Sequence, residues 1–419
     1  MQPLAHPDPH SGDGRSDVLA MLLAPSSPAE FLDRYFEKEP LHIGRGDTEY
    51  FRDVYDVGEV ESSIVVGALE HDKFVLVKFG SPQISVDAMT VERRHTRARH
   101  TGRPPQLVLD PRVILSYFDR GYTLVIKDAS LFSPRLQKFV NRVQQRLGFY
   151  TQTNVYFTPP KAQGFDVHHD THDTMVMQIE GTKTWRVYDP VVELPVESQP
   201  YSKEEHAKGL KLNRQVTLQP GDTLYVPHGF PHEAMTSEGG RSLHVTLAMT
   251  PMRVIDLLEA MVDLAAVTDV ELRRALPPGW HESKDFPAQF AALLRERLPK
   301  AFPAEHVPAA MHLVLRDLFA ITRTEAGGNF DELQRSLTLG PASVVALRDD
   351  TPFMLRRAGA NLELLVAGKS LGFPATYGVL FEKLREGPMT MQQVDAALPN
   401  NIGRSLVKML LLEGLVAID

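Results

Sequence analysis

The sequence predicts an α+β protein with an antiparallel β-structure of jelly-roll type at its centre and helices around it. Residues 151–250 alternate between apolar and polar side chains, and Pro and Gly turns divide them into short runs. On both sides of this region, apolar side chains recur at helical spacing. Short strands joined by tight turns favour a sandwich or barrel.

Composition limits the possible functions. The chain has 419 residues, so two or three domains are expected at roughly 150 residues each. It contains no cysteine, which excludes disulfides, zinc-thiolate sites, iron–sulfur clusters and thiol nucleophiles. A metal would therefore be held by His, Asp or Glu. The sequence shows neither a membrane-spanning run nor a secretory signal, so we expect a cytoplasmic protein that makes no contact with a membrane.

The residue pattern divides the chain into four segments. Residues 1–16 are rich in Pro, His, Gly and Asp and are predicted to be a disordered tail. Residues 17–250 contain the predicted jelly-roll unit. Residues 251–345 carry amphipathic helical patterns at 251–267 and 304–322, and a further helix is predicted at 331–339. In residues 346–419 a strand, three helices and a final apolar strand suggest a winged-helix-like domain. The expected recognition helix of that domain has few basic residues, which disfavours direct DNA binding.

The densest group of potential metal ligands lies in residues 164–185, GFDVHHDTHDTMVMQIEGTKTW. If this segment is a strand, His168 and Asp170 share one face and lie about 7 Å apart along the backbone. A second imidazole from a neighbouring strand would complete a 2-His-1-carboxylate face. That face leaves positions open for a cosubstrate and dioxygen, as in non-haem Fe(II) oxygenases.

Chance is the competing explanation for this group. The chain has 16 histidines, so accidental pairs are easily formed. Five His and Asp side chains between positions 168 and 173 would, however, be costly to bury without a compensating role. The crowding therefore favours a metal site.

The third ligand is expected in residues 221–234, GDTLYVPHGFPHEA. His232 falls where the chain re-enters the sheet after the turn. His228 is the alternative, only four residues earlier in the sequence. We favour His232, because a loop residue beside Pro-Gly is better suited to steering the geometry or touching substrate.

Two further positions fit the binding of a keto acid. Lys183 lies on the strand after the turn EGTK, where it could pair with the distal carboxylate of 2-oxoglutarate as a point charge. Asn154, in TNVYFTPP, could donate an amide hydrogen bond from an adjacent strand. A lysine after Glu-Gly is in other contexts an ordinary turn residue.

Together these segments resemble the JmjC-type ribosomal oxygenases, which are Fe(II)/2-oxoglutarate-dependent hydroxylases of ribosomal proteins. The resemblance includes TNVYFTPPKAQGFDVHHDTHDTMVMQIEGTKTWRVYDP, GDTLYVPHGFPHEA, SLHVTL and, near the start, FLDRYFEKEPLHI. It implies a double-stranded β-helix core of the jelly-roll or cupin type. It further implies a helical dimerisation domain over residues 251–345 and a winged-helix-like domain over residues 346–419.

The resemblance also assigns residues. The iron ligands of the family fall on His168, Asp170 and His232. Its 2-oxoglutarate contacts fall on Lys183 and Asn154. His244 matches a histidine of the same pocket, and Tyr156 matches a position that faces substrate. His169 and His228 depart from the Tyr and Arg usual in the family and are expected to contact substrate or to support the site.

The sequence therefore predicts a 2-oxoglutarate-dependent dioxygenase that uses Fe(II), 2-oxoglutarate and dioxygen. The resemblance implies that it hydroxylates a side chain of a protein substrate, expected to be a ribosomal protein, and that it acts as a homodimer. The alternatives are a JmjC N-methyl-lysine demethylase, a hydroxylase of a small molecule, a zinc hydrolase, and a metal-binding cupin scaffold without turnover.

Overall fold

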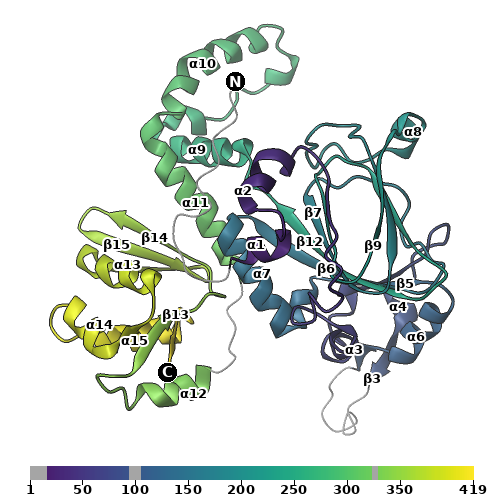
Figure 1. Cartoon of the computed structure of the whole chain (residues 1–419). Coiled ribbons are helices and arrows are strands. Elements are labelled where there is room, and N and C mark those ends of the chain that lie inside the picture. The colour runs from purple at the N-terminus through teal and green to yellow at the C-terminus, as the bar shows by residue number, and fades with distance from the viewer. Residues whose placement is uncertain (1–16, 94–104, 323–328) are drawn as a thin grey trace.

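The computed structural model describes residues 17–93, 105–322 and 329–419, so the predicted disordered tail at 1–16 lies outside the described residues. Three parts can be followed in Figure 1. Residues up to 250 form a β-structure with helices on its outer side. A helical arm extends away from it, and the end of the chain folds into a smaller unit of helices and strands.

Two antiparallel sheets form the β-structure. The larger sheet contains, in spatial order, β1 (Leu41–Ile43), β10 (Thr223–Val226), β7 (Asp173–Glu180), β12 (Ser242–Thr250), β6 (Tyr150–Thr158), β5 (Thr123–Lys127) and β2 (Phe74–Val77). The smaller sheet contains β11 (His232–Thr236), β8 (Lys183–Tyr188) and β9 (Leu212–Leu218). Buried side chains of both sheets, among them Val176, Trp185 and Leu224, pack into one cluster. The two sheets therefore face each other, in agreement with the predicted jelly-roll arrangement.

The outer face of the larger sheet is covered by helices whose ends are set by local sequence. In α7 (Pro134–Leu147), the Ser133 hydroxyl accepts a hydrogen bond from the Leu136 amide, and Gly148 ends the helix with φ 69°. Its buried residues Leu136 and Phe139 join the main core. The remaining elements of this part are α1 (Val18–Leu23), α2 (Pro28–Glu30), η1 (Phe31–Tyr35), α3 (Val57–Val66), α4 (Val86–Met89), β3 (Thr90–Arg93), β4 (Gln106–Leu109), α6 (Pro111–Asp119) and α8 (Lys203–His206).

The arm consists of α9 (Val254–Thr268), α10 (Phe286–Ala301) and α11 (Val307–Ala320). The helical patterns predicted after residue 250 correspond to α9 and α11. Helix α10 was not predicted, since it carries Pro287 in its first turn and Pro299 near its end, and its apolar residues do not follow a clean helical period. No helix among the described residues has both the length and the apolar character needed to cross a bilayer.

The C-terminal unit has its own core. The three predicted helices are α13 (Gly378–Glu386), α14 (Met391–Ala397) and α15 (Gly403–Leu412), and the two predicted strands are β15 (Asn361–Val366) and β18 (Val416–Ile418). The helix predicted at 331–339 corresponds to α12 (Asn329–Ser336). The unit also contains β13 (Val344–Leu347), β14 (Phe353–Ala358), β16 (Lys369–Pro374) and β17 (Met389–Thr390). Because β13 pairs with β17 and β18, this unit begins before residue 346.

The turn between β9 and β10 requires a glycine. Gly221 has φ +88°, and a Cβ at this position would lie 1.9 Å from the Asp47 carbonyl oxygen. We expect Gly221→Ala to lower the free energy of unfolding by about 3 kcal/mol, because it adds both backbone strain and overlap. Urea unfolding would measure the loss. Gly240→Ala is the matched control, since nothing lies within 4 Å of a Cβ there. Equal stability of the two variants would contradict the prediction.

Candidate metal centre

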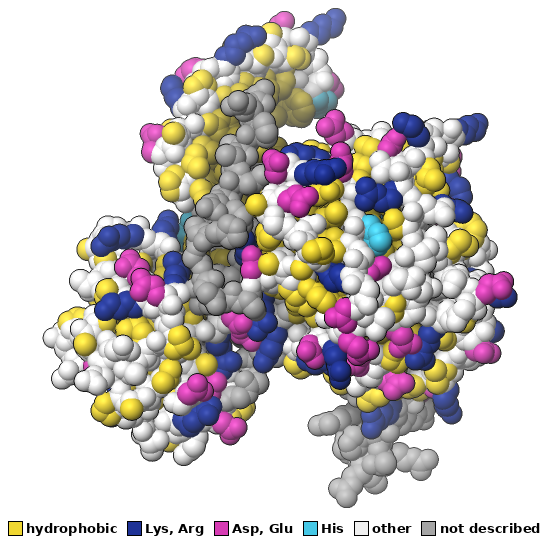
Figure 2. Space-filling view, in the orientation of Figure 1, with side chains coloured by type: hydrophobic (Ala, Val, Ile, Leu, Met, Phe, Trp, Pro, Cys, Tyr) yellow, Lys and Arg dark blue, Asp and Glu magenta, His cyan; other side chains and the backbone are white. Residues whose placement is uncertain are grey.

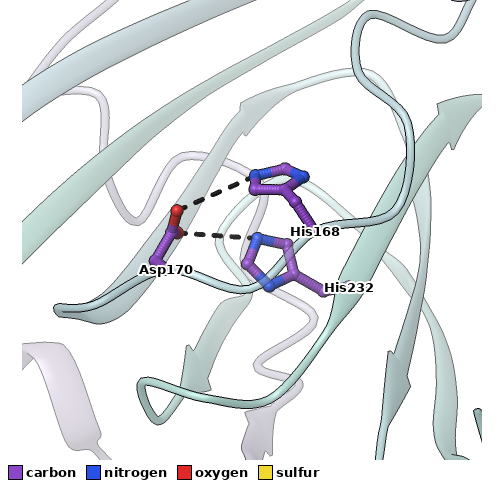
Figure 3. A group of neighbouring side chains, drawn as sticks. All are labelled: His168, Asp170 and His232. Carbon is purple, nitrogen blue, oxygen red and sulfur yellow. Dashed lines mark ion pairs between the residues drawn. The ribbon is translucent and has the colours of Figure 1, made fainter. Parts of the chain in front are cut away.

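Three side chains from two segments of the β-structure meet at one point (Figure 3). The His168 Nε2 atom lies 3.8 Å from Asp170 Oδ1, and His232 Nε2 lies 3.7 Å from Asp170 Oδ2. One ligand atom from each residue lies within 4.8 Å of the other two. A single divalent ion is within reach of all three side chains. The structure thus brings together the predicted triad and leaves His228 outside it.

The local backbone differs from the predicted strand. Strand β7 begins only at Asp173, and Asp170 lies in the loop before it. His168 forms an isolated antiparallel bridge with His232, in which each amide donates to the other carbonyl at 3.2 and 2.8 Å. This bridge therefore sets the positions of the two imidazoles. The predicted alternation of side chains along a strand at 168–170 does not set them. The loop is fixed further by the Gly229 amide, which donates to the Asp170 carbonyl at 3.0 Å.

Both imidazoles are oriented by backbone carbonyls. Nδ1 of His168 lies 2.8 Å from the Asp166 carbonyl oxygen, and Nδ1 of His232 lies 3.1 Å from that of Phe230. Since a carbonyl only accepts, each Nδ1 carries the hydrogen and each Nε2 keeps its lone pair. In both rings the Nε2 atom is the one near Asp170.

The charge states suit a divalent metal. Burial lowers the pKa of His232 to about 4, and the neighbouring His168 adds to this effect, so the ring is neutral at pH 7. Burial opposes ionisation of Asp170, but the imidazoles of His232, His172 and His168 outweigh it and lower its pKa. Two imidazoles and one carboxylate are the donor set of a 2-His-1-carboxylate site.

The triad opens into a cavity of about 180 Å³. Lys183, on β8, lines this cavity with only 4% of its surface exposed. Its Nζ donates to the Thr158 hydroxyl at 3.0 Å, and no carboxylate of the described residues forms an ion pair with it. Burial lowers the pKa of Lys183 to about 7. The cavity therefore contains a buried amine that lacks a counter-charge.

Strands β6 and β12 supply the wall beside this lysine. Tyr156 and His244 are paired in the register, and their rings stack at 4.8 Å with an interplanar angle of 5°. Asn154 lies on the same face of β6 as Tyr156, and it lines the cavity with both rings. Nδ1 of His244 and Oδ1 of Asn154 are buried and make no hydrogen bond to the described part of the chain. These two polar atoms are available for a ligand, so the structure brings together all four predicted residues.

Comparisons with known proteins agree with this geometry. Residues 128–257 match the JmjC domain. The chain is 34% identical to ribosomal oxygenase 1 of Rattus norvegicus over 278 residues, which is 64% of this chain and 44% of that protein. It is 30% identical to the bifunctional lysine-specific demethylase and histidyl-hydroxylase NO66 of Drosophila persimilis over 265 residues, which is 62% of this chain and 36% of that protein.

Residues 128–257 thus form a JmjC domain. The predicted resemblance to the ribosomal oxygenases is confirmed. The chain spans less than half the length of these curated relatives. A solved structure of the Escherichia coli ribosomal oxygenase YcfD, in complex with cobalt and 2-oxoglutarate, has a TM-score of 0.55 to this chain at 15% identity. The match covers 94% of this chain and 99% of that one, and it confirms the predicted α+β class with a cupin-type core.

Two residues predicted near substrate lie outside the cavity of the JmjC domain. His169 is buried and places Nε2 3.2 Å from the Gln199 carbonyl oxygen. His228 is buried against Asp173, with its Nδ1 2.7 Å from Oδ1 of that carboxylate. Their expected contact with substrate stays a prediction that this geometry does not favour.

Trp185 lines the cavity and was not assigned from the sequence. The spacing of Lys183 and Trp185 on one strand could have revealed Trp185, since residues two apart share a face. His172 and Glu233 also line the cavity, at positions where the sequence departs from the family and where contacts with substrate or with the site were expected. Glu233 follows His232 and accepts a hydrogen bond from the Tyr188 hydroxyl at 2.7 Å.

Removal of the buried amine of Lys183 should stabilise the protein when no carboxylate is bound beside it. Lys183 has a pKa of about 7 when folded and about 10.5 when unfolded, so the unfolded chain binds more protons between these values. Lys183→Met should therefore raise the free energy of unfolding, on the order of 4 kcal/mol below pH 7. The gain should shrink as the pH rises towards 10, as measured by urea unfolding at several pH values.

Lys73→Met is the control for this prediction. Lys73 Nζ pairs with Asp128 at 2.5 Å, and that contact raises its pKa. Its removal should not stabilise the protein at any of these pH values. A Lys183→Met variant that is less stable than the wild type at pH 6 would contradict the stated cost of the buried amine.

Proposed function

We propose that this chain is an Fe(II)- and 2-oxoglutarate-dependent dioxygenase that hydroxylates a side chain of a protein, with a ribosomal protein as its substrate. One observation carries the proposal. A triad of His168, Asp170 and His232 opens into the same cavity as the buried amine of Lys183. A metal face and a site for a carboxylate thus lie in one enclosed space.

The donor set supports iron as the metal. Two imidazoles and one carboxylate suit Fe(II) and leave coordination positions open towards the cavity. A hydrolytic zinc site can use similar ligands, but hydrolysis gives no role to a buried amine without a counter-charge. When bound, iron would supply the oxidative chemistry by which a C–H bond of the substrate becomes a hydroxyl group.

The inner end of the cavity supports 2-oxoglutarate as the cosubstrate. A carboxylate beside Lys183 would provide the missing counter-charge and favour the protonated amine. Thr158 fixes the position of the amine, and Asn154 and His244 offer polar atoms beside it. These residues bind and orient the cosubstrate, while the aromatic rings of Tyr156 and Trp185 exclude water from it. Decarboxylation to succinate would accompany the transfer of one oxygen atom to the substrate.

The relatives support a protein substrate. Two of them are named for ribosomal oxygenation, and the name of the Drosophila protein also includes histidyl hydroxylation and lysine demethylation. Demethylation of methyl-lysine is therefore the second candidate. A ribosomal substrate would place this enzyme in the cytoplasm, as the sequence predicts. The C-terminal unit would then have a packing or recruiting role, consistent with the predicted winged-helix-like domain.

Turnover tests the proposal directly. The purified protein, supplied with Fe(II), 2-oxoglutarate and ribosomal proteins, should form succinate and add one oxygen atom to a peptide, as detected by mass spectrometry. Loss of a methyl group instead would favour demethylation. His168→Ala should abolish succinate formation. Lys183→Met should raise the KM for 2-oxoglutarate by at least about 100-fold, because a desolvated charge partner is removed. Turnover with zinc in the absence of dioxygen would reject the proposal.

We also propose that the helical arm mediates a homodimer. Val254, Leu258 and Val262 recur at every fourth position of α9 and are 64, 39 and 42% exposed. This spacing aligns them in one apolar stripe. Trp280 and Phe290 add further exposed apolar surface at 44 and 38%. Apolar side chains are visible along the arm in Figure 2. Such a surface is typical of an interface between copies of a chain.

Light scattering after size-exclusion chromatography tests the dimer. The wild type should elute with the mass of two chains, and Leu258→Lys should shift it towards one chain, because a charge would be buried at the apolar interface. Leu412→Lys is the control, since Leu412 is also exposed, at 63%, but belongs to the C-terminal unit. A monomeric wild type, or equal dissociation of both variants, would contradict the assignment of the arm.

A further inference from the structure

The carboxylate of Asp173 is fully buried and takes no part in the proposed chemistry. Its side chain is 0% exposed. Oδ1 accepts a hydrogen bond from the His228 amide at 3.0 Å and lies 2.7 Å from Nδ1 of the same residue. Oδ2 accepts from the Tyr225 hydroxyl at 3.0 Å. A carboxylate removed from water needs such donors, so this group depends on partners that lie on another segment.

Those partners belong to β10 and to the turn that follows it. Tyr225 lies on β10, is also fully buried, and accepts a hydrogen bond from the Glu37 amide at 3.0 Å. His228 lies in the turn that leads to β11. The carboxylate at the start of β7 is thus connected to the turn through His228 and to the N-terminal part of the chain through Tyr225.

The same turn contacts both segments that carry the metal ligands. The Gly229 amide donates to the carbonyl of Asp170, and the Phe230 carbonyl accepts from the ring of His232. On its other side the turn is in close contact with the chain, because a Cβ at Gly229 would lie 2.4 Å from the Val192 carbonyl oxygen. A shift of this turn would therefore displace Asp170 and rotate His232.

We propose that Asp173 and His228 form a positioning pair. The pair holds the turn at residues 227–231 against the loop that carries His168 and Asp170, so that the triad is arranged before the metal binds. Neither residue is a catalytic residue, since each acts through Gly229 and Phe230. The inference rests on the proposed metal centre. His228 lies outside the cavity, and the positioning pair gives this residue a role there.

Two substitutions at His228 distinguish its hydrogen bond to Asp173 from its filling of buried space. Asn can place its Nδ2 where His has Nδ1, so His228→Asn keeps the donor to Asp173. His228→Leu keeps a bulky side chain but has no donor. We expect His228→Leu to bind Co(II) about 10–100-fold more weakly than the wild type, and His228→Asn to bind it nearly as well as the wild type. Visible absorption of bound cobalt, titrated into the full chain without cosubstrate, measures this.

A second measurement distinguishes an effect of the positioning pair from an effect on the cosubstrate site. With saturating Fe(II), the KM for 2-oxoglutarate should be unchanged in His228→Leu, because Lys183 lies at the end of β8 that pairs with Thr236, away from residues 227–231. Asn141→Leu is the stability control. It removes a buried hydrogen bond to the Asp350 carbonyl, between α7 and the C-terminal unit, at 2.8 Å. It should lower the Tm and leave cobalt affinity unchanged.

The outcomes distinguish this inference from the function on which it rests. Equal cobalt affinity in the wild type and in His228→Leu overturns the positioning pair and leaves the metal centre intact. A wild type that does not bind cobalt rejects the metal centre and, with it, this inference. If His228→Leu does not fold, Asp173→Asn provides the same comparison, with weaker cobalt binding supporting the pair and unchanged binding overturning it.

Discussion

The two backbone hydrogen bonds between His168 and His232 are the contact on which the site depends. They join a loop that precedes β7 to the first residue of β11, and these elements belong to different sheets. A bridge of this kind fixes the separation and direction of both side chains at once, because each residue is donor and acceptor to the other. Asp170 then needs only a short loop to meet them.

A second constraint is the unfavourable burial of Lys183. A stable core would not contain an amine with one hydroxyl partner, and its lowered pKa shows that burial acts against the charged form. The surrounding structure maintains this cost, since Lys183 and Trp185 extend inward from β8 while Tyr156 and His244 close the opposite wall. The free energy that burial of the amine costs would be recovered on binding of an anion, in keeping with the proposed carboxylate ligand.

The sequence predicted most of what depends on short-range pattern. The strands of 151–250 and the three helices near the C-terminus follow from the spacing of their apolar residues. The triad was predicted, but for an incorrect local reason, because the His168 bridge is a long-range pairing that no pattern within 164–185 encodes. Strands such as β13 and β16 were missed, since tertiary packing outweighs their weak propensities, and helix α10 was missed because of its two prolines.

His228 shows why motif spacing alone does not assign roles. In the sequence, two histidines four residues apart compete for one metal position, and both are flanked by turn residues. In the fold, the competition is decided by the turn between them. Gly229 adopts φ +85° and reverses the chain, so that His228 points to Asp173 while His232 points to Asp170. One histidine is therefore placed at a buried carboxylate and the other at a carboxylate that faces the cavity. A glycine in the left-handed region thus separates a structural imidazole from the one proposed to bind the metal.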